Sequence, residues 1–185
     1  MNHIQIYDNI LSKEGCQHII DYFESNIDIS FPGLSGNIVN KKDKDSTDLS
    51  LRLEHPRNKD EYEVNEYILK TLKKGTEKYR KKFKFLDRVV DIWHLDDRFN
   101  IQRFDEGQGY HGVHCEHTKH EYRMLVWMIY LNNAKCGTRF YEPQRDVKAK
   151  EGRLVMWPSD WTYPHSGITP NRGKKYIATG WFSYH

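Results

Sequence analysis

The feature that most constrains the fold is a change of sequence pattern near residue 88. From there to the C-terminus, short runs of aliphatic, aromatic and β-branched residues alternate with turn residues such as Gly107, Gly152 and Gly173. The runs are residues 88–94, 98–104, 110–116, 123–132, 138–141, 153–157 and 174–183. Several short strands separated by turn signals predict an antiparallel sandwich or a closed barrel.

The first half of the chain favours helices after a short strand at residues 4–7. Ser12 is a predicted cap for a helix that runs to about Asn26. A second helix is predicted from Asp60 to about Phe83, and Gly75 is a candidate position for a break in it. The expected apolar side of the first helix is Ile19, Ile20, Tyr22 and Phe23, and that of the second is Tyr62, Val64, Tyr67, Ile68, Leu72 and Tyr79. The pattern predicts an α+β, mainly β protein.

Length and composition limit the number of domains and the kind of protein that this chain can form. The 185 residues fit one domain, 1–185, with helical support over about 1–87 and a β-core with the site over about 88–185. The 29 basic and 26 acidic side chains nearly cancel, so nucleic-acid binding is not expected. Three scattered cysteines without a C-x-x-C motif, no signal peptide and no apolar run near the roughly 20 residues of a membrane span predict a soluble, cytoplasmic protein.

Two polar stretches leave alternatives open. Residues 31–48 are rich in Gly, Ser, Lys and Asp, which favours a solvated loop, although a long loop is also typical of a segment beside a substrate entrance. The Lys-rich end of the second helix, residues 70–82, fits a solvated helix C-terminus better than a nucleic-acid surface.

The polar residues between 110 and 117 are the strongest candidates for chemistry. In a strand, His114 and Glu116 would point to the same side, so both could contact one metal ion. His165 follows in the part of the chain expected to return across the barrel. Two histidines and one carboxylate form the facial triad of non-haem Fe(II) oxygenases. The alternative zinc group of His111, His117 and His120 lacks a fourth ligand pattern, so these residues, like His94, are expected to have no metal role.

The last strand adds a candidate anion-binding residue. Strand alternation places Lys175 on one face with Ile177, Thr179 and Trp181, and this face is expected to point inward. A buried ammonium needs an anion opposite it. The carboxylate of a cosubstrate would supply that anion.

From Phe104 to Trp181 the sequence resembles the prolyl 4-hydroxylase-like branch of the Fe(II)/2-oxoglutarate dioxygenases, especially the short stand-alone members often carried by bacteriophages. The positions that carry the resemblance are Phe104, Gly107, Tyr110, His114, Glu116, Arg123, Tyr130-Leu131-Asn132, Gly137-Thr138-Arg139-Phe140, Gly152-Arg153-Leu154, Trp157-Pro158, His165, Lys175 and Trp181. Two positions depart from the family pattern: Glu116 replaces the common Asp, and Phe104 replaces a frequent Tyr.

The resemblance implies a double-stranded β-helix (jelly-roll) core and a set of site residues. It implies that His114, Glu116 and His165 bind Fe(II), and that Lys175, with Tyr130 and Thr179, binds 2-oxoglutarate. Dioxygen is the second cosubstrate, and ascorbate is an additional reductant in the family. Arg123 matches a family arginine for which a structural ion pair is an equal alternative, and Trp181 is expected to form pocket wall.

The expected function is an oxygenase that hydroxylates a C–H bond and releases succinate and CO2. The resemblance suggests a peptidyl, first of all prolyl, substrate, although a small-molecule substrate stays open. Nucleic-acid demethylation is disfavoured because no Arg follows Lys175. A catalytically silent metal-binding jelly roll that acts as an interaction module is the alternative from another class, and Glu116 is the residue that favours it.

Overall fold

The computed structural model of the chain describes residues 2–89, 92–117 and 122–184. In chain order the elements are β1 (Gln5–Tyr7), α1 (Lys13–Ser25), the 3-10 helix η1 (Ile27–Ile29), β2 (Phe31–Pro32), β3 (Thr47–Arg52), α2 (Lys59–Lys82), α3 (Leu86–Val89), β4 (Trp93–Phe104), β5 (Arg123–Tyr130), β6 (Gly137–Phe140), β7 (Arg145–Lys148), β8 (Arg153–Pro158), β9 (His165–Ile168) and β10 (Lys175–Tyr184). The helices precede most strands, as predicted.

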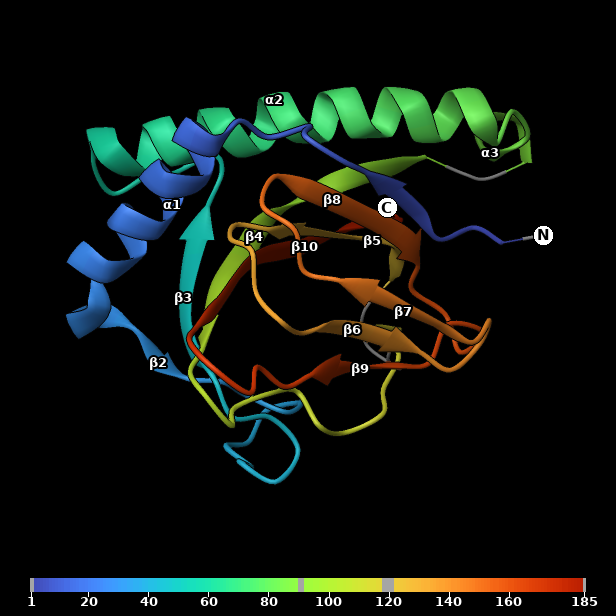
Figure 1. Cartoon of the computed structure of the whole chain (residues 1–185). Helices are drawn as coiled ribbons and strands as arrows, with labels where there is room; N and C mark the ends of the chain where they lie inside the picture. Colours follow the sequence, from blue (N-terminus) through green and yellow to red (C-terminus); the bar gives the residue numbers. More distant parts are fainter. Residues whose placement is uncertain (1, 90–91, 118–121, 185) are drawn as a thin grey trace.

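Two antiparallel sheets form the β-core. The larger has seven strands in the order β1-β8-β5-β10-β4-β3-β2, and the smaller has three in the order β7-β6-β9. Figure 1 shows the small sheet on one side of the large sheet and helices α1 and α2 on the other. This is the predicted double-stranded β-helix (jelly-roll) core with supporting N-terminal helices.

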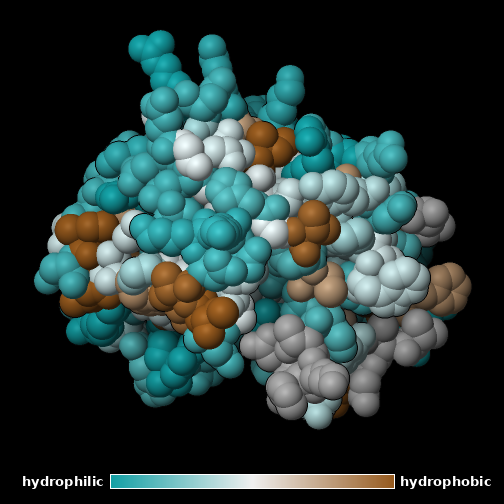
Figure 2. Space-filling view, turned by 90° about the horizontal axis from the view of Figure 1, so that it is seen from below, coloured by the Kyte–Doolittle hydropathy of each residue, from teal (hydrophilic) through white to brown (hydrophobic). Residues whose placement is uncertain are grey.

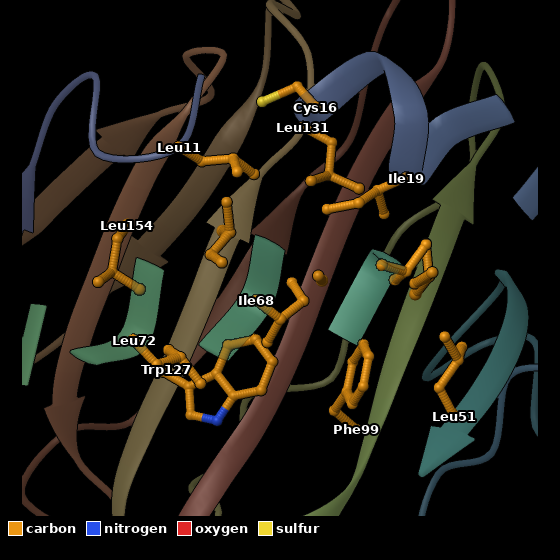
Figure 3. Packing of buried hydrophobic residues seen from close by; sticks show 14 of the residues in the cluster. Leu11, Cys16, Ile19, Leu51, Ile68, Leu72, Phe99, Trp127, Leu131 and Leu154 are labelled. Atoms are coloured by element: carbon orange, nitrogen blue, oxygen red, sulfur yellow. The ribbon is translucent and has the colours of Figure 1, made fainter. Parts of the chain in front are cut away.

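Strand β5 shows why the core has two apolar layers. Leu125, Trp127 and Ile129 point toward the helices, whereas Val126 and Met128 point between the two sheets. Both faces of β5 are buried, so its sequence is a continuous apolar run instead of an alternating one. Figure 3 shows the helix-side layer, in which Trp127 and Leu154 of the sheet lie near Ile68 and Leu72 of α2.

Both long helices form where predicted, with two corrections. The Ser12 side chain accepts a hydrogen bond from the Gly15 amide and so caps α1. Helix α2 is not broken at Gly75; the missing side chain lets the helix approach β8, where an added Cβ would lie 2.2 Å from Leu154 Cδ2. Tyr62 was expected inside but is 55% exposed, because it lies on the solvent side of α2.

Three strand predictions are corrected. Residues 110–116 form an irregular segment with isolated bridges at Tyr110 and His114 instead of a strand. The predicted strand 88–94 begins only at Trp93, after α3, with residues 90–91 outside the described part. Strand β4 continues through Asp96 and Asp97, where a turn was expected, because Asp97 accepts hydrogen bonds from Arg52 and the Glu54 amide.

The segment at residues 31–48 is held against the site segment by backbone hydrogen bonds. The carbonyl of Asp43 accepts from the amides of His111 (2.6 Å) and Gly112 (3.1 Å), and the Asp45 amide donates to Gly109 (2.9 Å). Lys41 and Lys42 are exposed, in agreement with a solvated loop. Its end forms the first residues of β3, and several of its other side chains line a cavity described below. In the described part of the chain, no helix combines the length and the apolar character needed to cross a membrane.

Candidate active site and metal centre

A cavity of about 570 Å³ lies between the two sheets. It is lined by residues from the large sheet, the small sheet, the irregular segment at 105–117 and the segment at 31–48. In Figure 1 these last two segments lie at the lower end of the molecule with β9, and Figure 2 views this face from below. Apolar side chains lie among polar ones there, so this face offers both kinds of contact to a ligand.

His114 and His165 are placed in the cavity by a backbone bridge between their segments. The His114 amide donates to the His165 carbonyl (3.0 Å), and the His165 amide donates back to the His114 carbonyl (2.9 Å). His165 begins β9, whereas His114 lies outside any strand. The amide of Glu116 donates to the Ser159 carbonyl (3.0 Å), which brings the carboxylate to the same place.

The three predicted metal-binding side chains converge on one point. Glu116 Oε1 lies 3.6 Å from Nε2 of His114 and 3.6 Å from Nε2 of His165. One ligand atom from each residue falls within 4.8 Å of the others. Among the described residues no other group of three or more such side chains is close enough to hold a metal ion.

The outer nitrogen of each histidine fixes the orientation of its ring. Nδ1 of His114 donates to the Gly112 carbonyl (2.9 Å), and Nδ1 of His165 donates to the Tyr163 carbonyl (3.0 Å). Since a carbonyl oxygen only accepts, Nδ1 carries a proton in each ring, and Nε2 of each ring faces Glu116. This arrangement is typical of metal-binding histidines, whose second nitrogen is held by a backbone or carboxylate oxygen.

The charge of Glu116 is stabilised on both oxygens. Burial acts to raise the pKa of this carboxyl group, but hydrogen bonds and charge interactions with His114 and His165 outweigh it and hold the pKa well below its usual range. The second oxygen, Oε2, accepts from Trp181 Nε1 (3.1 Å) and Arg123 (3.4 Å). The Arg123 guanidinium also lies 3.6 Å from the Trp181 ring centre. Arg123 therefore makes the structural ion pair considered above, and Trp181 forms pocket wall.

Aromatic rings surround the two histidines. The Tyr110 ring stacks on His114 at 3.7 Å between centroids, nearly parallel. Trp157 and Phe140 lie 5.2 and 5.5 Å from His165. These contacts limit the rotation of both imidazole rings.

Lys175 points into the same cavity from β10, as strand alternation predicts. It is 2% exposed, its Nζ lies 4.2 Å from the centre of the Phe104 ring, and the described residues supply no carboxylate partner. Desolvation by burial lowers the pKa of Lys175 to about 8. A buried cation without an anion indicates a site where an anionic ligand would be stabilised.

The other two predicted cosubstrate residues have different positions. Thr179 lines the cavity, and its hydroxyl donates to the Trp127 carbonyl (3.0 Å). Tyr130 is fully buried behind Thr138, and the two hydroxyls form a 2.7 Å hydrogen bond. Thr138 itself lines the cavity and was not predicted as a site residue. Its alternation with Phe140 in β6 is the sequence signal that could have identified it.

Four further cavity residues were missed: Lys44, Asp48, Asn100 and Gln102. Asn100 and Gln102 share the inner face of β4 with Phe104, so strand alternation could have found them. Lys44 and Asp48 lie in the segment at 31–48, for which the sequence allows either a solvated loop or a segment beside a substrate entrance. The excluded histidines are outside the metal group: His94, His111 and His117 are exposed, and His120 lies outside the described residues.

The chain is similar to known proteins in part of its sequence and in its fold. The sequence profile of the 2OG-Fe(II) oxygenase superfamily matches residues 99–183. No curated protein sequence is close enough to the chain to count as a match.

Similar solved structures include three prolyl hydroxylases. One from Pseudomonas putida, a prolyl-4-hydroxylase, has 15% identity, a TM-score of 0.74 and coverage of 100% of this chain and 94% of that one. The viral collagen prolyl hydroxylase of Paramecium Bursaria Chlorella virus-1, in its 2OG complex, has 18% identity, a TM-score of 0.72 and coverage of 100% and 97%. A prolyl hydroxylase from Trichoplax adhaerens, in complex with a hypoxia inducible factor peptide fragment, has 16% identity, a TM-score of 0.79 and coverage of 99% and 84%.

Proposed function

We propose that this dioxygenase, whose residues 99–183 match the 2OG-Fe(II) oxygenase superfamily, hydroxylates a C–H bond of a peptidyl residue, prolyl first. It uses Fe(II), 2-oxoglutarate and O2. Succinate and CO2 would be the coproducts. A solved structure similar in fold binds a peptide fragment, which supports a peptide substrate. A cytoplasmic location stays a prediction.

The observation that carries the proposal is that one cavity contains both a metal-type donor set and an unpaired buried cation. His114, Glu116 and His165 would hold Fe(II), because their Nε2 and Oε1 atoms face one another and their other polar atoms are already bonded. Bound Fe(II) would supply the activation of dioxygen. The longer arm of Glu116, compared with the common Asp, is held by Trp181 and Arg123.

Lys175 would bind the far carboxylate of 2-oxoglutarate. Its ammonium lies in the cavity wall against Phe104, where a carboxylate would stabilise the charge that burial disfavours. Thr138 is better placed than Tyr130 to add a hydrogen bond, since Thr138 lines the cavity and Tyr130 lies behind it. Tyr130 would then orient the Thr138 hydroxyl, and Thr179 would contribute to the wall.

A mass-spectrometric assay tests this function. The protein is incubated in air with Fe(II), 2-oxoglutarate and a library of proline-containing peptides, and products are searched for an added oxygen. We expect a peptide that gains one oxygen and an equal amount of succinate. Lys41→Met is the matched positive control, because Lys41 is exposed outside the cavity, and Glu116→Ala is the negative control.

The outcomes separate the candidate functions. Succinate without a modified peptide would contradict the peptide substrate and favour a small molecule. No succinate under any condition would contradict the oxygenase and leave the silent interaction module.

A further inference from the structure

A buried polar cluster lies in the cavity wall formed by β3 and β4, and the proposed chemistry does not use it. Asp48 accepts hydrogen bonds from Lys44 Nζ (2.6 Å), the Ser46 hydroxyl (2.7 Å) and Gln102 Nε2 (3.0 Å). Lys44 is 6% exposed and Asp48 is 2% exposed. Lys44, Asp48 and Gln102 all line the cavity.

Stability is a weak explanation for this cluster. Removing two charges from water is unfavourable, and a protein with apolar residues of similar volume in their place is often as stable or more stable. The hydrophobic cluster between the sheets, which includes Phe104 and Ile177, would offer apolar neighbours to such residues. An ion pair in this wall therefore points to a role in the cavity.

The cluster has hydrogen-bonding capacity left over. An ammonium has three donors, and among the described residues Lys44 Nζ has Asp48 as its hydrogen-bond acceptor and no other. Gln102 uses its amide nitrogen on Asp48, which leaves its oxygen Oε1 without a donor in the described part of the chain. The Asn100 side chain, next to Gln102 on the inner face of β4, has no hydrogen bond to a described residue and also lines the cavity. Donors and acceptors thus lie side by side on a wall whose charges cancel.

The cluster is joined to the metal-type donor set by one aromatic ring. Lys44 Nζ lies 5.5 Å from the centre of the Tyr110 ring, and the same ring stacks on His114 at 3.7 Å. Lys44 and Tyr110 also form a backbone bridge. A substrate with one residue at the metal would therefore place a neighbouring residue at this wall.

We propose that Lys44, Asp48, Gln102 and Asn100 form a specificity subsite for a neutral carboxamide, the side chain of Asn or Gln, next to the residue that is hydroxylated. A carboxamide supplies both an acceptor for Lys44 and a donor for Gln102, and it adds no charge to a neutral wall. An apolar side chain would leave these buried groups unpaired, which is unfavourable for binding. The proposal rests on the proposed function insofar as the substrate is a peptide.

The test measures peptide binding without turnover. The protein is loaded with Mn(II) and 2-oxoglutarate under argon, and its affinity is measured for short fluorescent peptides with a central proline. The flanking residues are Asn or Gln in one set, Asp or Glu in a second, and Leu or Met in a third. We expect the carboxamide set to bind at least about tenfold more tightly than the Leu or Met set.

Two variants test whether the preference for carboxamide peptides depends on the cluster, and a third variant is the control. Lys44→Met/Asp48→Leu removes both charges together, which avoids leaving one buried charge unpaired, and should abolish the preference. Asn100→Leu leaves the ion pair in place and should reduce it. Lys41→Met removes an exposed lysine from the same segment and should preserve it.

The binding results either support or overturn the proposed carboxamide subsite. Equal affinity for the three peptide sets, or a preference for the acidic set, would overturn the carboxamide subsite, as would a preference that survives in both variants. Binding of none of the peptides would overturn it as well. A carboxamide preference that disappears in the variants supports it even if no peptide gains oxygen in air, in which case the proposed hydroxylation alone fails.

Discussion

At the scale of single residues, two neighbouring lysines in opposite environments report on the register of the last strand. Lys175 is buried in the cavity, whereas Lys174 is half exposed on the other side and lies 3.9 Å from Glu24. Lys175 pairs with Phe104 of β4, and Ile177 pairs with Gln102. A shift of one residue would exchange the two lysines.

We therefore predict different effects for two alanine variants. Lys175→Ala should weaken 2-oxoglutarate binding by about ten- to a hundredfold, since hydrogen bonds to charged groups contribute roughly 1.5–3 kcal/mol and 1.4 kcal/mol is a factor of ten. Lys174→Ala should change it little. Anaerobic calorimetry with Fe(II) present measures both. A damaging Lys174→Ala with a harmless Lys175→Ala would contradict the register.

The lowered pKa of Lys175 gives a pH dependence. Below pH 8 the buried ammonium is charged and can bind the carboxylate; above pH 8 the free protein loses this proton, so 2-oxoglutarate affinity should fall. Burial also raises the pKa of the neighbouring Cys136 thiol, so this group stays neutral near pH 8. Affinity measured from pH 7 to pH 9.5 tests the trend. Lys175→Arg should remove the fall, because a guanidinium keeps its charge.

The same group affects stability without cosubstrate. The unfolded chain keeps the lysine proton up to the ordinary pKa of 10.5, whereas the folded chain releases it near 8. The unfolded state thus binds more protons between these values, and this lysine makes stability rise with pH in that window. Urea unfolding at pH 8 and at pH 10, compared between the parent and Lys175→Met, measures the contribution.

The sequence identified the metal-type donor set and Lys175, which the structure brings together in the cavity, but not several of the other cavity residues. His114, Glu116 and His165 stand out by residue type, and their role as metal ligands stays a prediction. Lys44 and Asp48 lie in a polar segment, and neither composition nor periodicity shows that it folds inward. The position of Tyr130 behind Thr138 depends on side-chain packing between β5 and β6, which strand alternation alone does not determine.

At the scale of secondary-structure elements, apolar strands were predictable and short polar strands were not. Strands β5, β8 and β10 lie close to their predicted ranges because their burial requires apolar runs. Strand β7 is mostly charged, and β9 has four residues that begin at His165 and include Gly167. Both strands form because they pair with β6. The local sequence of β7 or β9 does not show this pairing.

Gly75 provides a test of how α2 packs on β8. Ala favours a helix over Gly by up to about 1 kcal/mol, but a Cβ here would lie 2.2 Å from Leu154 Cδ2, in a fully buried contact. Overpacking of this kind costs roughly 1–3 kcal/mol, so Gly75→Ala should lower the free energy of unfolding. Urea denaturation measures the change.

A double variant checks the contact itself. In Gly75→Ala/Leu154→Ala the new methyl group enters space left by Leu154. The double variant should therefore lose less free energy of unfolding than the two single variants lose together. Strictly additive effects would mean that the two residues do not touch. A stabilising Gly75→Ala would mean that the Leu154 side chain can move to make room for the added methyl group.

At the scale of the whole molecule, the helices and the small sheet divide the two faces of the large sheet. Helices α1 and α2 cover one face with apolar contacts, and the small sheet leaves a cavity over the other (Figure 1). The cavity thus draws its residues from both sheets, the irregular segment at 105–117 and the segment at 31–48. The helix-side apolar layer lies behind β4 and β10, which are strands of the large sheet. A single domain over residues 1–185 stays a prediction.

The most direct test of the central claim is an anaerobic Fe(II) titration. The parent should bind one Fe(II) per chain. Loss of a hydrogen-bonding partner behind a ligand typically costs 10- to 100-fold in metal affinity, so His114→Ala and His165→Ala, which each remove one of three ligands, should weaken binding by more than about a hundredfold. His111→Ala, at an exposed histidine outside the group, should bind like the parent. One tightly bound Fe(II) in folded His114→Ala and His165→Ala would contradict the metal centre on which the function rests.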